Sequence, residues 1–132
     1  MLLHVPLSVG EVLDKVTILE IKSERIVAKA KLKNITAELE QVKALLTDPI
    51  FAKPAVQKLV AELKAVNEVL WDIEDRIREQ EALENFGDRF VDLARAVYVT
   101  NDKRAQIKKK LNKATGSALV EEKSYKDYTG RG

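Results

Sequence analysis

Four carboxylates with regular spacing are the side chains of this chain that are best suited to metal chemistry. Glu11 and Asp14 are three residues apart, and so are Glu81 and Glu84. This spacing places both members of a pair on one face of a helix. Two such pairs on facing helices would offer the oxygen ligands that Mg²⁺ prefers. The alternative interpretation is that Glu11 caps a helix and that the other three are solvated at one end of a bundle.

Arg25 and Arg104 are the side chains that we consider for anion binding. Arg25 interrupts the apolar series that begins at Ile18, and a guanidinium there needs a carboxylate or water, because unpaired burial is costly. In one interpretation Arg25 forms an ion pair that fixes the helix register. In the other, Arg25 and Arg104 bind a phosphate or a carboxylate. The candidate acidic partners of Arg25 are Glu68, Asp72, Asp75 and Asp102.

Positive charge is concentrated near the C-terminal end. The net charge of the 132 residues is +2, but residues 101–132 carry nine basic and four acidic side chains. Six of the basic residues fall between Lys103 and Lys113. Lysines near a helix C-terminus also suit the helix dipole. No aromatic residue interleaves them, so nucleic-acid binding is the less favoured interpretation of this segment.

Composition excludes several classes of site. The chain has no cysteine and one histidine, His4, which excludes disulfides, thiolate sites, histidine-rich zinc sites and a serine triad of the usual kind. No apolar run approaches the roughly 18 residues of a membrane span, and residues 1–5 are too short for a signal-peptide core. We therefore expect a cytoplasmic protein with no membrane partner.

Three long helices must position these residues. Apolar residues recur at intervals of three and four between prolines and glycines, which is typical of long helices packed side by side. Ser8 and Glu11 form a capping-box pattern at the first helix start. The pattern predicts an all-α single domain, residues 1–132, folded as an antiparallel three-helix bundle with coiled-coil-like helices and short non-helical ends. The predicted helices cover residues 9–46, 55–84 and 89–113, and an arm or tail covers 117–132.

The predicted helix lengths favour a homodimer. A first helix of about 38 residues would be longer than a third helix of about 25. Apolar residues near the end of the first helix would then lack a neighbour from the third, and a second copy or another helical protein would cover them. These predicted interface residues are Leu39, Val42, Leu45 and Leu46.

Several long stretches resemble one known family. The opening VPLSVGEVLDKVTILEIKSERI, and later LWDIEDRIRE, FVDLARAVYVTNDKRA and GSALVEEKSY, are similar to an uncharacterised bacterial family of short helical proteins. The similarity extends from Val5 to Tyr125. The family is a domain of unknown function, sometimes encoded near genes for surface-polysaccharide synthesis. The resemblance implies a stand-alone cytoplasmic domain and supplies no catalytic residues.

These observations predict a non-catalytic helical module that assembles with itself or with another helical protein and needs no cofactor. The first alternative is a Mg²⁺-dependent all-α hydrolase of a nucleotide or sugar-nucleotide that uses Glu11, Asp14, Glu81 and Glu84. The second is an anion-binding or nucleic-acid-binding protein that uses Arg25, Arg104 and the basic third helix. Whether the four carboxylates converge on one point distinguishes the first alternative from the others.

Overall fold

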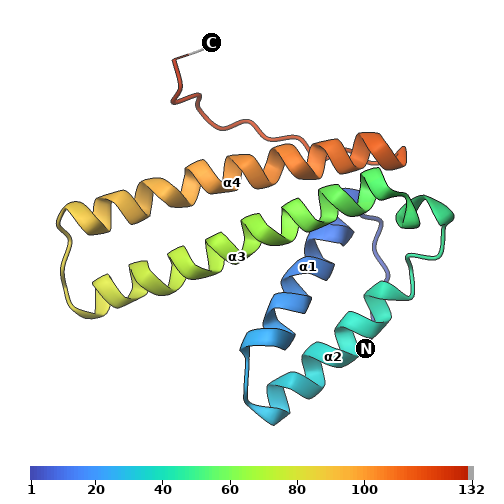
Figure 1. Cartoon of the computed structure of the whole chain (residues 1–132), viewed down its shortest axis with the longest axis horizontal. Helices are drawn as coiled ribbons and strands as arrows, with labels where there is room; N and C mark the ends of the chain where they lie inside the picture. The colour runs from blue at the N-terminus through green and yellow to red at the C-terminus, as the bar shows by residue number, and fades with distance from the viewer. Residues whose placement is uncertain (131–132) are drawn as a thin grey trace.

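Two helix hairpins make up the chain in a computed structural model that describes residues 1–130 (Figure 1). The helices are α1 (Val9–Arg25), α2 (Lys29–Lys43), α3 (Pro54–Ala82) and α4 (Asp88–Thr115), with a short 3-10 helix, η1 (Pro49–Ala52), before α3. Helices α3 and α4 lie side by side, and α1 contacts α2, α3 and α4. The all-α class is confirmed, and no strand occurs among the described residues. Residues 131 and 132, part of the predicted tail, lie outside the described residues.

The predicted single helix over residues 9–46 is wrong, because the chain turns back at residues 26–28. Ile26 and Ala28 both have extended backbone angles, with ψ of 132° and 118°. The adjacent β-branched pair Ile26 and Val27 has a low helix propensity. Breaking the helix here lets α2 fold back onto α1, which buries Ile35. The chain therefore has four helices instead of the three in the predicted bundle.

The other two helices agree with the predicted segments to within a few residues. Pro54 occupies the first turn of α3, where its missing N–H costs no hydrogen bond. Gly116 ends α4 in the left-handed conformation, with φ of 65°, which glycine adopts without a steric cost. After Gly116 the chain runs back along α4, where the rings of Tyr98 and Tyr128 meet edge to face at 5.0 Å.

The start of α1 is built into the core. Ser8 caps the helix by accepting a hydrogen bond from the Glu11 N–H at 3.2 Å. One turn later Leu13 joins a buried apolar cluster that α3 and α4 complete. The members of this cluster are Leu13, Val56, Leu63 and Leu111. The capping half of the Ser8–Glu11 pattern is thus confirmed, and the start of α1 is fixed against the α3–α4 hairpin.

The helix break also removes the predicted overhang. Helix α2 packs against α1, so Leu39 and Val42 are half-buried. Leu46 packs against the core cluster beside Ile50 and Phe51. Leu45 alone among the four predicted interface residues is largely exposed. The length argument for a dimer interface at these positions was therefore wrong, because the first helix is shorter than predicted.

A search of the described residues for a helix both long and apolar enough to cross a membrane finds none.

Candidate functional site

A buried ion pair joins the start of α1 to the middle of α4. Asp14 is only 1% exposed, and both of its carboxylate oxygens accept hydrogen bonds from the Arg104 guanidinium, one of them at 2.9 Å from Nε. The Asn67 side chain on α3 donates a third hydrogen bond to Asp14, at 2.9 Å. The hydrogen bonds to Asp14 hold the pKa of Arg104 above its ordinary value. A bidentate pair of this kind fixes orientation as well as charge.

One turn further along α4, Lys108 forms a second buried contact. Its ammonium group donates to Glu11 at 2.6 Å and to Glu121 at 2.9 Å, so it ties α1 to the C-terminal segment. Burial opposes the charge on Lys108, but the two carboxylates outweigh burial and raise the pKa of Lys108. The hydrogen bond from Lys108 to the Glu121 carboxylate holds the pKa of Glu121 below its ordinary value. Lys123 also lies 3.6 Å from Glu121.

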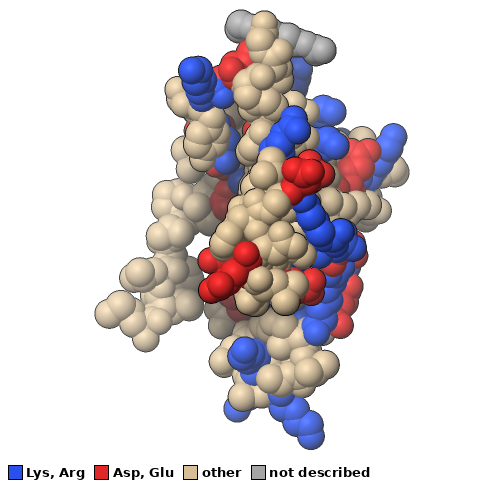
Figure 2. Space-filling view, turned by 90° about the vertical axis from the view of Figure 1, so that its left-hand side faces the viewer, with Lys and Arg blue, Asp and Glu red and all other residues tan. Residues whose placement is uncertain are grey.

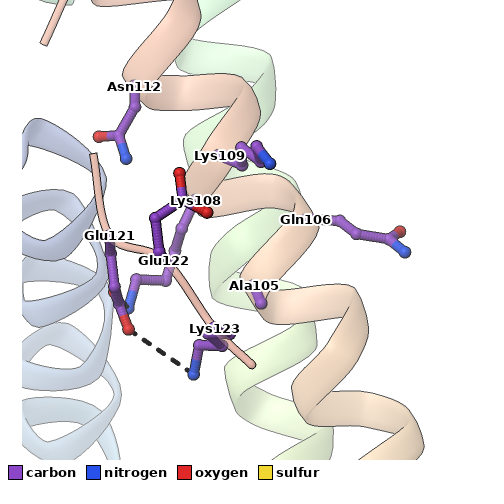
Figure 3. A pocket seen from close by; sticks show the side chains of 8 residues that line it. All are labelled: Ala105, Gln106, Lys108, Lys109, Asn112, Glu121, Glu122 and Lys123. Carbon is purple, nitrogen blue, oxygen red and sulfur yellow. Dashed lines mark hydrogen bonds and ion pairs between the residues drawn. The ribbon is translucent and has the colours of Figure 1, made fainter. Parts of the chain in front are cut away.

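A small cavity of about 160 Å³ lies beside this contact, and Figure 3 shows the side chains that line it. Lys108 points from α4 toward Glu121, whereas Lys109 and Gln106 point away from it. The cavity is lined by basic and acidic side chains together, so it carries no strong excess of either charge. Its lining residues are Ala105, Gln106, Lys108, Lys109, Asn112, Glu121, Glu122 and Lys123.

Gly10 permits the close approach of α1 and α4. A Cβ at this position would lie 2.6 Å from the Lys108 carbonyl oxygen and 2.9 Å from Asn112 Oδ1, which is too close for any other residue. The Gly10 N–H instead donates to Asn112 Oδ1 at 2.6 Å, and the Val9 N–H donates to Ser117 Oγ at 3.0 Å. These bonds satisfy free N–H groups of the first turn of α1.

The predicted four-carboxylate site is not formed, because α1 does not run antiparallel to α3. Asp14 contacts Asn67, and Arg25, further along α1, contacts Asp72, further along α3. Glu81 stands 14 residues beyond Asn67, or about 21 Å along a helix axis. Glu84 follows at the exposed end of the α3–α4 hairpin. Among residues 1–130, no group of three or more acidic, histidine or cysteine residues is placed to hold a metal ion.

Arg25 has the acidic partner that the sequence predicts. It donates to Asp72 at 2.6 Å and lies 3.9 Å from Glu68, and its guanidinium is 5.8 Å from the centre of the Trp71 ring. The hydrogen bond to Asp72 raises the pKa of Arg25. The side chain is one-third exposed, so this pair lies at the surface. Arg25 is therefore paired with Asp72, and Arg104 is paired with Asp14.

Sequence reasoning missed several members of the network. Asn67, Asn112 and Glu121 are not among the predicted site residues, and Lys108 is predicted only as part of the basic segment of the anion-binding or nucleic-acid-binding alternative. The available signal is the four-residue spacing of Arg104, Lys108 and Asn112, which places three polar groups on one face of α4 next to the buried Leu111. The basic pattern of residues 103–113 is typical of a solvated helix end, whereas the structure buries Lys108.

The network holds three parts of the chain together. Its buried charges are matched by opposite charges, so the arrangement joins α1, α4 and the C-terminal segment. Two surfaces adjoin this junction: the segment that precedes Ser8, and a groove between α4 and the segment that follows Gly116.

Comparison with known proteins gives one match. Neither the curated proteins nor the solved structures contain a match to this chain. A family model described as a family of unknown function, DUF6165, matches residues 3–130, which is nearly the whole chain. The chain therefore belongs to this family of unknown function, DUF6165.

Proposed function

We propose that the protein is a non-catalytic assembly module that forms a homodimer, in which residues 1–7 of each copy lie in an apolar groove of the other. We name these residues the apolar segment. The observation that carries the proposal is the exposure of this segment. Leu2, Leu3 and Val5 are 64%, 74% and 64% exposed, and Met1 and Leu7 are also exposed.

The apolar segment has an unusual surface. It contains no acidic residue, lysine or arginine, and in Figure 2 an arm without charged residues stands away from the body, where positive and negative side chains are mixed. Its residues form neither a helix nor a strand. Scattered exposed leucines are normal on a protein, but a contiguous group of this kind marks an interaction site.

A groove on the same molecule matches the segment in chemistry. It has a volume of about 350 Å³ and lies where α1, the end of α2, η1 and α3 meet. Glu20, Lys43 and Gln57 also line it, but most of its wall is apolar. The apolar lining residues are Leu13, Val16, Leu46, Phe51, Val56 and Val60. An uncharged segment can enter such a groove without the desolvation cost that a charged segment would carry.

A second copy is the occupant that covers both surfaces together. Within one chain the segment stays exposed and the groove stays open. In a two-fold symmetric dimer each segment would cover the groove of the other copy. Full burial of one leucine or valine contributes about 1.5–3 kcal/mol. Several such residues from both segments offset the roughly 4–15 kcal/mol that association costs.

The buried network would support this arrangement. Just after the apolar segment, the Val9 N–H donates to Ser117, which follows α4, and the Gly10 N–H donates to Asn112 near the end of α4. The base of the segment is therefore held in place, which lowers the ordering cost of docking.

Leu3→Asp tests the proposal, because a carboxylate in the groove would be strongly desolvated. Sedimentation equilibrium at micromolar concentration should give a dimer for the unaltered chain and a monomer for Leu3→Asp. The matched control is Val27→Asp, which changes an apolar residue of the α1–α2 turn that is 89% exposed, against 74% for Leu3. This control should remain dimeric. A monomeric unaltered chain, or equal dissociation of both variants, would contradict the proposal.

A further inference from the structure

The segment that follows Gly116 forms one wall of a groove along α4. Three adjoining cavities of about 160, 620 and 920 Å³ make up this groove, and Gln106 lines all of them. The other wall comes from α4, between Val97 and Lys113, a distance of about 24 Å along the helix axis. The groove lies within one chain and does not include the apolar segment, so it is independent of the proposed dimer.

One end of the groove gathers every tyrosine of the chain. Tyr98 on α4 and Tyr125 and Tyr128 in the C-terminal segment all line the cavity of about 920 Å³. Tyr125 is 81% exposed and the other two rings are also exposed. A hydrogen bond with Asp102 of α4 raises the pKa of Tyr128 and connects this tyrosine to the helix. Exposed aromatic rings of this kind are surfaces on which nucleic-acid bases can stack.

The other end of the groove is basic. Lys109, Lys110 and Lys113 line the cavity beside Gly116, and none of them has an ion pair within residues 1–130. No acidic side chain of the described residues lines this cavity. The acidic residues of the groove lie in the other two cavities, where Glu121 is already paired with lysines. These acidic residues are Asp102, Glu121, Glu122 and Asp127.

We propose that this groove binds single-stranded nucleic acid, with bases stacked on the tyrosines and phosphates paired with the lysines. The sequence disfavours nucleic acid because no aromatic residue interleaves residues 103–113. The fold removes this objection, because the C-terminal segment turns back along α4 and places Tyr125 and Tyr128 beside the same helix (Figure 1). Unpaired lysines and stacking surfaces on one groove are the combination that binds a single strand.

The salt dependence of binding tests the role of the lysines. Fluorescence anisotropy of a labelled oligo(dT) of roughly ten nucleotides should show saturable binding at low salt. Each phosphate contact of a single strand contributes about 0.7 to the slope of log K against log salt concentration. The triple variant Lys109→Gln, Lys110→Gln and Lys113→Gln should therefore lower this slope by about 2.

A matched control removes the same charge from α2. All six lysines of the two variants are exposed and have no ion pair within the described part of the chain, so both variants should fold. The control should leave the slope unchanged, whereas an equal reduction in both variants would overturn the proposal. The control substitutions are Lys29→Gln, Lys31→Gln and Lys33→Gln.

Tyr125→Ala separates stacking from charge. It should weaken binding about tenfold at every salt concentration without changing the slope, because one stacking surface is lost. Tyr125→Phe keeps the ring and should bind like the unaltered chain, and so should Phe86→Ala, which removes an exposed ring between α3 and α4. Equal affinities of Tyr125→Ala and Tyr125→Phe, equal binding of a duplex of the same length, or no saturable binding at low salt would overturn the proposal.

Discussion

The buried Asp14–Arg104 pair makes a quantitative prediction for stability. Arg104→Met keeps the aliphatic length of the side chain but removes every donor from one Asp14 oxygen, and it leaves the other with Asn67 alone. Removing one partner of a buried ion pair costs about 3–5 kcal/mol. The Arg104 side chain is 28% exposed, so water can reach part of the site, and we expect about 3 kcal/mol.

Urea unfolding followed by circular dichroism measures this effect. For a chain of this size, such a loss should lower the midpoint by about 1–2 M. Arg25→Met is the matched control, because Arg25 also pairs with an aspartate but lies at the surface. Its midpoint should stay close to that of the unaltered chain. The double variant Asp14→Leu with Arg104→Met should recover much of the lost stability, since it leaves no unpaired charge.

Equal midpoints for Arg104→Met and Arg25→Met would refute the reasoning. Such a result would mean that the Asp14 carboxylate reaches water or other donors when Arg104 is absent.

Two further predictions concern the same junction. Gly10→Ala should lower the free energy of unfolding by about 1–3 kcal/mol, because the alanine Cβ would meet the Lys108 carbonyl oxygen at 2.6 Å. This loss should exceed the gain from the better helix propensity of alanine. A higher melting temperature of the variant in calorimetry would contradict this close contact. The pKa of Glu121 is lowered in the folded chain, so its contribution is present above the ordinary carboxyl pKa and is lost as the pH falls through the lowered value. Amide hydrogen exchange at Ser117–Glu121 should therefore accelerate below about pH 4, beyond its intrinsic pH dependence. The variant Glu121→Gln should lack this acceleration. An acceleration that persists in Glu121→Gln would assign it to another titrating group.

Local features of the fold could be predicted from the sequence, and the long-range arrangement could not. The cap at Ser8 and the end of α4 at Gly116 depend on neighbouring residues alone. The break after Arg25 has no glycine or proline to mark it, and the apolar spacing continues through Ala28 into Leu32. Packing of α2 on α1 decides this turn, and packing of that kind is not visible in local spacing.

The same limit explains the outcome for the site residues. Asp72 is among the predicted partners of Arg25, and the two form an ion pair although Arg25 is the last residue of α1 and not the middle of a long helix. The four carboxylates required a specific antiparallel register, and the helix break changes that register. Asp14 is predicted as a metal ligand, whereas its partners in the structure are Asn67 and Arg104, which are 53 and 90 residues away.

Cross-linking between two single-cysteine variants tests the proposed assembly most directly. The chain has no cysteine, so each introduced thiol is unique. Leu3→Cys marks the apolar segment, Gln57→Cys marks the groove, and Glu79→Cys marks a distant position on α3. Mild oxidation of mixed Leu3→Cys and Gln57→Cys chains should give a covalent dimer of twice 14.9 kDa, well above the yield from Leu3→Cys mixed with Glu79→Cys. Equal yields from the two mixtures would contradict docking of the segment in the groove of a second copy.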